Sequence, residues 1–346
     1  MRLSYLNYLP RLEGSSAIGA HALVIGRVRA GPGLTLGEYA TVRADGEAVD
    51  LGQDVFLGER ATIHIVHDVY GTRVGDRATI GRYALVHGCT LGDEVVLGPG
   101  STVMDGAVVG ARALLLPDTI VPPRKTLEGE HVYAGNPARA VRPLAAGELA
   151  RWHQALRRGA VPAQAPAGAM PLGPVVVPAR PADLHRPVAT FVAATAGCGG
   201  TIELADEGAI YFACVIDAGA GRIAIGRGSN IQDNSLLRVS GASGELVIGD
   251  DVTVGHNVRI GSGSIGDRAL IGMASVLADG VVVEAGACVG AGAWVEPGAR
   301  IESGWIWAGR PARPFREIRK REGDGFLDII SIYKEYSEFY RHQQDG

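Results

Sequence analysis

The fold is decided by the stretch RVGDRATIGRYALVHGCTLGDEVVLG at residues 73–98. It aligns without a gap on VIGDDVTVGHNVRIGSGSIGDRALIG at 247–272, an offset of 174 residues. The same offset places YAGNPARA (133–140) on WAGRPARP (307–314). The chain is therefore a tandem duplication, and the two copies can be compared residue against residue.

A shorter period runs inside each copy, in which an aliphatic residue followed by Gly returns at about six-residue steps. The first copy has it at Leu51-Gly52, Leu57-Gly58 and Val74-Gly75, and the second at Ile248-Gly249 and Val254-Gly255. Such a period is typical of a parallel β-helix. Each unit supplies one short strand and one turn, with the aliphatic side chain inward and Gly allowing the backbone to turn.

The six-residue period with this choice of residues resembles the left-handed β-helix of the hexapeptide-repeat superfamily, and the left-handed sense is implied by that resemblance alone. Composition agrees, because 50 Gly and only 6% aromatic residues suit a narrow core of small aliphatic side chains. We expect an all-β solenoid of two tandem left-handed parallel β-helix domains, each followed by a short α-helix.

The domain boundaries follow from the repeats and from the segments between them. We expect a first β-helix over 1–144, a helix plus a Pro- and Ala-rich linker over 145–187, a second β-helix over 188–320 and a C-terminal helix over 321–346. The C-terminal segment places aromatic and aliphatic residues at helical spacing, which predicts a helix that packs its apolar face on a neighbouring surface.

Charge and cysteine content narrow the classes of function. A net charge of −4 and a pI near 6.2 give no reason to expect nucleic acid or an acidic membrane as a partner. The sequence shows neither a spanning apolar run nor the apolar core of a signal peptide. Cys89, Cys198, Cys214 and Cys288 lack CxxC spacing and indicate buried thiols in a reducing compartment, so we expect a cytoplasmic protein.

The residues that carry chemistry are Arg43 and Asp45 in VRAD, His64 in ATIHIVH and His87 in VHGC. Here the sequence resembles the γ-class carbonic anhydrases, with their VRGD, NIQD, LH, GH and HGC pattern. In that family three histidines bind zinc or an iron(II)-type metal, two from one subunit and the middle one from its neighbour in a trimer. The resemblance implies reversible hydration of carbon dioxide with zinc, iron(II) or cobalt as cofactor.

Spacing supports the pair His64 and His87 without the family. Each follows an inward aliphatic residue, Ile63 or Val86, so the two histidines sit one coil apart. A strand spacing of about 4.8 Å brings both imidazoles within reach of one ion. Spacing alone slightly favours the alternative, a stacked polar pair on an exposed face, hydrogen bonded to each other or to Asp45.

The third ligand of the resemblance is expected at position 82, which holds Arg82, and a guanidinium cannot coordinate a cation. The second copy holds the complement. His256 occupies the missing position, while the two histidines of the first copy are answered by Arg238 and Gly261. Neither copy is complete, yet together they keep each expected ligand once.

The remaining family residues are divided in the same way. Gln232 of the second copy stands where the first has Gly58, and the resemblance implies that it positions water or bicarbonate. Arg43 and Asp45 are kept only in the first copy. We count them with Gln232 in the candidate catalytic site, but favour an interfacial salt bridge over direct catalysis as their role.

Two interpretations stay open. In the first, a first-copy face meets a second-copy face, so that His64, His87 and His256 enclose one metal, and a three-fold arrangement then needs a third β-helix from another chain. In the second, each copy trimerises with its own kind and the chain is a catalytically degenerate structural or assembly subunit. Both predict a homo-oligomer or pseudo-trimer, and the first allows another γ-carbonic-anhydrase-like chain as partner.

A rival from another enzyme class is acyl transfer, because many left-handed β-helices are acyltransferases that depend on coenzyme A. Such enzymes use a histidine as general base. The candidates here are His67, beside the short excursion HDVYGTR, and His131.

Overall fold

The computed structural model describes residues 1–162, 183–241 and 244–345. It is an all-β parallel solenoid, as expected, and it divides into two compact units, Met1–Pro174 and Val175–Gly346. The Pro- and Ala-rich part of the expected linker falls largely on 163–182, outside the described residues. The left-handed sense and the domain boundaries drawn from the sequence stay predictions.

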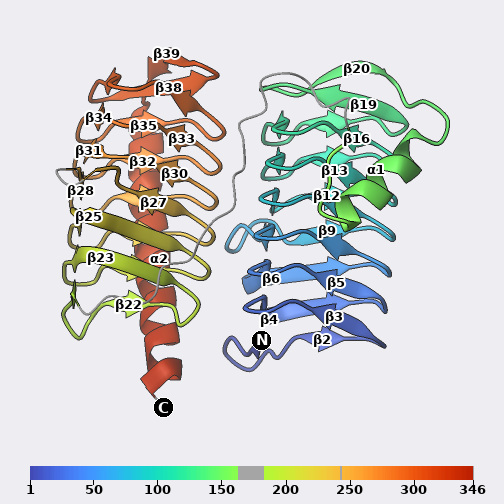
Figure 1. Ribbon diagram of the computed structural model, residues 1–346, viewed down its shortest axis with the longest axis horizontal. Coiled ribbons are helices and arrows are strands. Elements are labelled where there is room, and N and C mark those ends of the chain that lie inside the picture. Colours follow the sequence, from blue (N-terminus) through green and yellow to red (C-terminus); the bar gives the residue numbers. More distant parts are fainter. Residues whose placement is uncertain (163–182, 242–243, 346) are drawn as a thin grey trace. The chain divides into compact units, whose positions relative to one another are not determined.

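The first unit stacks short parallel strands coil upon coil into three faces (Figure 1). One face contains β3 (Ser16–Ile18), β5 (Leu34–Leu36), β7 (Phe56–Leu57), β10 (Thr79–Ile80), β13 (Val96–Leu97), β16 (Leu114–Leu115) and β19 (His131–Ala134), closed by the antiparallel β20 (Arg139–Pro143). The second contains β8 (Thr62–His64), β11 (Leu85–His87), β14 (Thr102–Val103) and β17 (Ile120–Val121). The third contains β9 (Thr72–Val74), β12 (Thr90–Leu91), β15 (Val108–Val109) and β18 (Thr126–Leu127). Two long strands, β4 (Leu23–Ala30) and β6 (Thr41–Leu51), join the second face to the third, and β1 (Arg2–Leu3) and β2 (Arg11–Leu12) pair with β4.

The second unit repeats this plan. Its first face contains β22 (Phe191–Val192), β24 (Ala209–Ile210), β26 (Asn230–Ile231), β29 (Thr253–Val254), β32 (Leu270–Ile271), β35 (Cys288–Val289) and β38 (Trp305–Gly309), closed by the antiparallel β39 (Ala312–Glu317). The second contains β27 (Leu236–Arg238), β30 (Arg259–Ile260), β33 (Val276–Leu277) and β36 (Trp294–Val295). The third contains β28 (Glu245–Ile248), β31 (Gly263–Ile265), β34 (Val281–Val283) and β37 (Arg300–Ile301). The long β25 (Val215–Ile225) joins these two faces, and β23 (Gly197–Leu204) and β21 (Leu184–His185) precede it.

The glycines of the repeat have a different role from the one expected. Gly75 does not have a left-handed backbone, and the left-handed residue is Arg77, two positions later, with φ of 54°. A Cβ atom on Gly75 would lie 2.4 Å from Oδ1 and 2.6 Å from the backbone nitrogen of Asp93 on the next coil. The repeat therefore needs Gly because successive turns stack too closely for a side chain.

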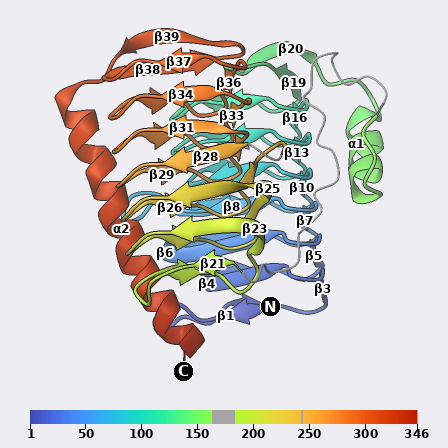
Figure 2. The same cartoon turned by 60° about the vertical axis from the view of Figure 1, so that its left-hand side comes forward.

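Two helices follow the β-helices in the described ranges. In the first unit α1 (Glu148–Arg157) packs Leu149, Trp152 and Leu156 on an apolar patch of the first face. In the second unit α2 (Lys320–Asp345) runs along the stacked coils, as Figures 1 and 2 both show. Within the described ranges, neither helix is both long and apolar enough to span a bilayer.

Candidate metal centre

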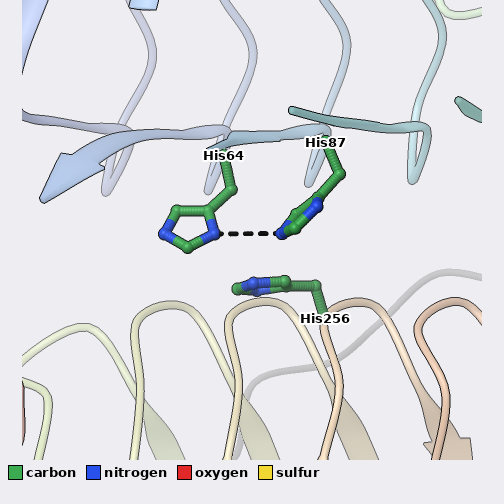
Figure 3. A group of neighbouring side chains, drawn as sticks. All are labelled: His64, His87 and His256. Atoms are coloured by element: carbon green, nitrogen blue, oxygen red, sulfur yellow. Dashed lines mark hydrogen bonds between the residues drawn. The ribbon is translucent and has the colours of Figure 1, made fainter. Parts of the chain in front are cut away.

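His64 and His87 are neighbours on the second face of the first unit. They end β8 and β11, and their Cα atoms are register partners in the parallel pairing of these strands. The preceding residues, Ile63 and Val86, point into the core and are fully buried. Alternation along a strand turns the histidines to the opposite side. Figure 3 shows their rings facing each other, with 3.2 Å between Nδ1 of His64 and Nε2 of His87.

Each histidine is held from behind by a carboxylate. Nε2 of His64 lies 2.9 Å from Oδ1 of Asp45, and Nδ1 of His87 lies 2.6 Å from Oδ1 of Asp105. A carboxylate accepts a hydrogen bond, so each of these nitrogens carries a proton. A carboxylate behind a histidine fixes the tautomer and makes the other nitrogen more basic, as in carboxylate–histidine–zinc groups.

With the protons on the nitrogens that contact the carboxylates, the two nitrogens that face each other are left with lone pairs. If both rings are neutral, Nδ1 of His64 and Nε2 of His87 are both acceptors, only 3.2 Å apart. Two lone pairs at this distance repel unless a proton or a cation lies between them. Two ligands at about 2.0–2.1 Å from a tetrahedral zinc ion are separated by about 3.3–3.4 Å. The pair therefore fits a metal ion in separation, in tautomer and in its supporting carboxylates.

Arg43 and Asp45 lie on β6 and are both fully buried. The guanidinium forms an ion pair with Oδ2 of Asp45, while Oδ1 of the same carboxylate contacts His64. Arg43 thus balances the charge of the carboxylate that orients His64. An interfacial or catalytic role for either residue stays a prediction.

His256 lies in the second unit, just after β29 and Gly255, and is fully buried. Its Nδ1 lies 3.2 Å from Oδ2 of Asp233, whose Oδ1 accepts a hydrogen bond from the backbone N–H of Phe212. Its Nε2 lies 3.1 Å from the hydroxyl of Tyr333 on α2. The nearby carboxylate favours the tautomer protonated at Nδ1, which leaves Nε2 as the atom that can bind a metal.

Gln232 follows β26, one coil before His256, and is nearly fully buried. Its amide nitrogen lies 3.2 Å from Oδ1 of Asn230, whose own amide nitrogen donates to Oγ1 of Thr253 at 3.1 Å. This short polar network holds the Gln232 side chain in place.

In the second unit Arg238 and Gly261 stand at the positions of the two histidines, and Arg238 forms an ion pair with Asp217, the residue at the position of Arg43. Asp217 and Arg238 are register partners in β25 and β27, and Nε of Arg238 lies 3.2 Å from Oδ2 of Asp217. At Gly261 a Cβ atom would come within 2.4 Å of Oδ1 of Asp279. In the first unit Arg82 corresponds to His256 of the second, and Nη2 of Arg82 lies 3.7 Å from Oε2 of Glu59. Each unit thus holds only its own share of the expected ligands.

Three site residues were missed in the sequence. Asp105 stands 18 positions after His87, which is three hexapeptides or one coil, so the period could have located it. Asp233 belongs to the NIQD motif next to Gln232. Tyr333 belongs to the aromatic residues at helical spacing in the C-terminal segment, and no local pattern connects it with His256.

The candidates for a general base in acyl transfer lie elsewhere in the first unit. His67 is partly exposed, and its Nε2 lies 3.4 Å from Oδ2 of Asp68. His131 on β19 has Nδ1 2.8 Å from the carbonyl oxygen of Gly129. In both, a ring nitrogen contacts a neighbouring residue of the same segment.

A sequence-family model described as the hexapeptide repeat of succinyl-transferase matches residues 49–82, 71–105 and 263–297. Gamma carbonic anhydrase 3, a mitochondrial protein of Arabidopsis thaliana, is 46% identical over 38% of this chain and 53% of its own length. Protein YrdA of Escherichia coli is 37% identical over 42% of this chain and 82% of its own length. The chain spans about half the length of the three plant relatives that it matches.

A crystal structure from Desulfovibrio desulfuricans G20, described as an acetyltransferase, covers 98% of this chain and 80% of its own, with a TM-score of 0.54. At 12% identity this likeness concerns the fold alone.

Proposed function

This chain belongs to the γ-carbonic-anhydrase-like family of hexapeptide-repeat proteins, and on that premise we propose that it is a metal-dependent enzyme for the reversible hydration of carbon dioxide. The metal is zinc, with iron(II) or cobalt as substitutes. The site is composite, with His64 and His87 from a first-copy face and His256 from a second-copy face. Figure 3 draws the three proposed ligands.

The observation that carries the proposal is the pair of facing nitrogens in the first unit. Nδ1 of His64 and Nε2 of His87 are 3.2 Å apart, and the opposite nitrogen of each ring contacts a carboxylate. A purely structural pair would be more stable with one N–H donor pointing at one acceptor. When both rings are neutral, the two carboxylates turn both lone pairs inward, which is the arrangement that a metal cation needs.

The third ligand is proposed from the division between the copies. His256 stands where the first copy has Arg82, and a proton on Nδ1, the nitrogen 3.2 Å from Oδ2 of Asp233, leaves Nε2 for the metal. His64, His87 and His256 each offer one imidazole nitrogen, and three such ligands leave one position of a tetrahedral zinc open. A three-fold arrangement of β-helices then takes its third member from another chain, either a second copy of this chain or a related protein.

When bound, the metal supplies Lewis acidity toward water and carbon dioxide. The residues of this chain supply the rest. Asp45 and Asp105 orient the histidines, and Arg43 balances the charge of the buried Asp45 carboxylate through its ion pair. Gln232, held by Asn230, offers its amide to water or bicarbonate.

The test is the amount of metal per chain after expression with zinc, and after anaerobic expression with iron. We expect His64→Ala, His87→Ala and His256→Ala each to lose the metal and carbon dioxide hydration together, because two imidazoles hold a divalent ion poorly. His67→Ala, at a partly exposed histidine outside the set, is the matched control and keeps both. Wild-type protein without metal under both conditions would refute the proposal.

A second candidate is a degenerate structural subunit, favoured by the Asp217–Arg238 ion pair and by Arg82. In that case His256→Ala changes neither the metal content nor the activity. Wild type and His256→Ala assayed side by side therefore separate the two functions.

A further inference from the structure

The hydroxyl of Tyr333 lies 3.1 Å from Nε2 of His256, the nitrogen proposed to bind the metal. Tyr333 belongs to α2, and both side chains are buried. This contact lies wholly within the second unit, so it is a property of that unit by itself.

The position of Tyr333 is fixed by its surroundings. The hydroxyl of Tyr211 donates to the backbone carbonyl of Tyr333 at 2.6 Å, and the two rings meet edge to face with centroids 5.1 Å apart. The hydroxyl of Ser337, one helical turn on, bonds to the same carbonyl. Tyr333 therefore points its hydroxyl at His256 because the helix is held there.

The direction of the hydrogen bond follows from the other side of the ring. Asp233 lies 3.2 Å from Nδ1 of His256 and favours a proton on that nitrogen. Nε2 then has a lone pair, and the Tyr333 hydroxyl donates to it. An imidazole nitrogen has one lone pair in the ring plane, so a hydroxyl donor and a metal ion cannot share it.

We propose that Tyr333 is a latch on the third metal ligand, a positioning residue that holds Nε2 of His256 until a metal displaces it. The inference rests on the proposed function, because it assigns His256 as a ligand. Metal entry breaks the bond between Tyr333 and His256, and this couples occupancy of the site to helix α2.

A comparison of the two copies supports the pairing of Tyr333 with His256. At the offset of 174 residues His256 corresponds to Arg82 and Tyr333 corresponds to Gly159, so ligand and hydroxyl are present together in one copy and replaced together in the other. α1 ends at Arg157, before the position that corresponds to Tyr333, whereas α2 continues well past it. The additional length of α2 is what brings the hydroxyl to His256.

The first experiment uses metal-free full-length protein and nitrogen-15 NMR of the histidine rings. We expect His256 to be protonated at Nδ1, with Nε2 accepting a hydrogen bond in wild type and losing it in Tyr333→Phe. Tyr340 is a buried tyrosine of the same helix, and its ring packs on Phe191. Tyr340→Phe is therefore the matched control and should leave the His256 signals unchanged. A wild-type His256 protonated at Nε2 would overturn the latch.

The second experiment measures zinc affinity by competition with a chelator. Tyr333→Phe removes the competitor for the lone pair, so we expect zinc to bind about five-fold more tightly, the factor that corresponds to one ordinary hydrogen bond. Tyr340→Phe should bind zinc as wild type does. Unchanged or weaker binding in Tyr333→Phe overturns the latch and leaves the proposed function standing. Absence of zinc from wild type and variant alike refutes the proposed function, and the NMR result then decides the latch alone.

Discussion

At the scale of single residues, the repeat depends on how closely one turn lies on the next. The side chain of Asp93 reaches back one coil and accepts the backbone N–H of Asp76 at 2.9 Å, directly over Gly75. In the second unit the side chain of Asp267 accepts the backbone N–H of Asp250 in the same way, also at 2.9 Å. The six-residue period predicts Gly at these positions, but the role expected for Gly was to allow the backbone to turn. The close approach comes from the stacking of coils, which only the three-dimensional structure displays.

We expect Gly75→Ala to destabilise the first unit. The new methyl group would lie 2.6 Å from the backbone nitrogen of Asp93, so the coils must separate. Overpacking of this kind costs about 1–3 kcal/mol, which urea unfolding resolves. Gly323→Ala is the control, since no atom lies within 4 Å of a Cβ there and Ala is the better helix former. Equal stability of wild type and Gly75→Ala would contradict the stacking argument.

At the scale of elements, the two helices begin with the same ion pair. Arg142 forms two bonds of 2.7 Å with the carboxylate of Glu148, and Arg316 repeats this with Glu322 at 2.7 Å and 2.6 Å. Arg316 and a backbone N–H lower the pKa of Glu322 to about 2. Helical periodicity predicted both helices, whereas the ion pairs, although separated by the same 174 residues, were missed because no local pattern connects the hairpin with the helix.

The docking of α1 should weaken in mild acid. Burial, and then the charge of Arg157, lower the pKa of His153 below its ordinary value of 6.5, and its Nδ1 lies 2.7 Å from Oγ1 of Thr79. Since the unfolded chain takes up the proton more readily, this contribution to stability is complete above pH 6.5 and is lost as the pH falls through the folded pKa. We expect hydrogen exchange of α1, corrected for the intrinsic pH dependence of exchange, to speed up as the pH falls below 6.5.

His153→Gln tests the cause, because it keeps a polar group near Thr79 but does not titrate. Its exchange rates, corrected for the intrinsic pH dependence of exchange, should be flat over this range. The same acid-induced loosening of α1 in wild type and variant would show that another group titrates.

At the scale of the whole molecule, the sequence predicts the fold more completely than it predicts the site. A six-residue period specifies one strand and one turn at a time, so the solenoid and the adjacency of His64 and His87 follow from counting residues. The contact between Tyr333 and His256 joins residues 77 positions apart through the packing of a helix on a β-helix. Side-chain volume and helix length decide such packing together, and neither is periodic.

The last prediction concerns which chains contribute to one site. The two copies share one polypeptide, and a covalent link raises the effective concentration of one copy around the other. We therefore expect each composite site to take His64, His87 and His256 from the same chain.

The experiment uses two variant chains that carry different tags. A His64→Ala/His87→Ala chain and a His256→Ala chain should each lack metal. Mixed oligomers isolated through both tags should lack it too, while wild type carries one metal per chain. Light scattering should give these oligomers a mass of at least two chains of 36.0 kDa, because a three-fold arrangement needs a β-helix from a further chain. Recovery of metal and activity in the mixed oligomers would show that the ligands come from different chains.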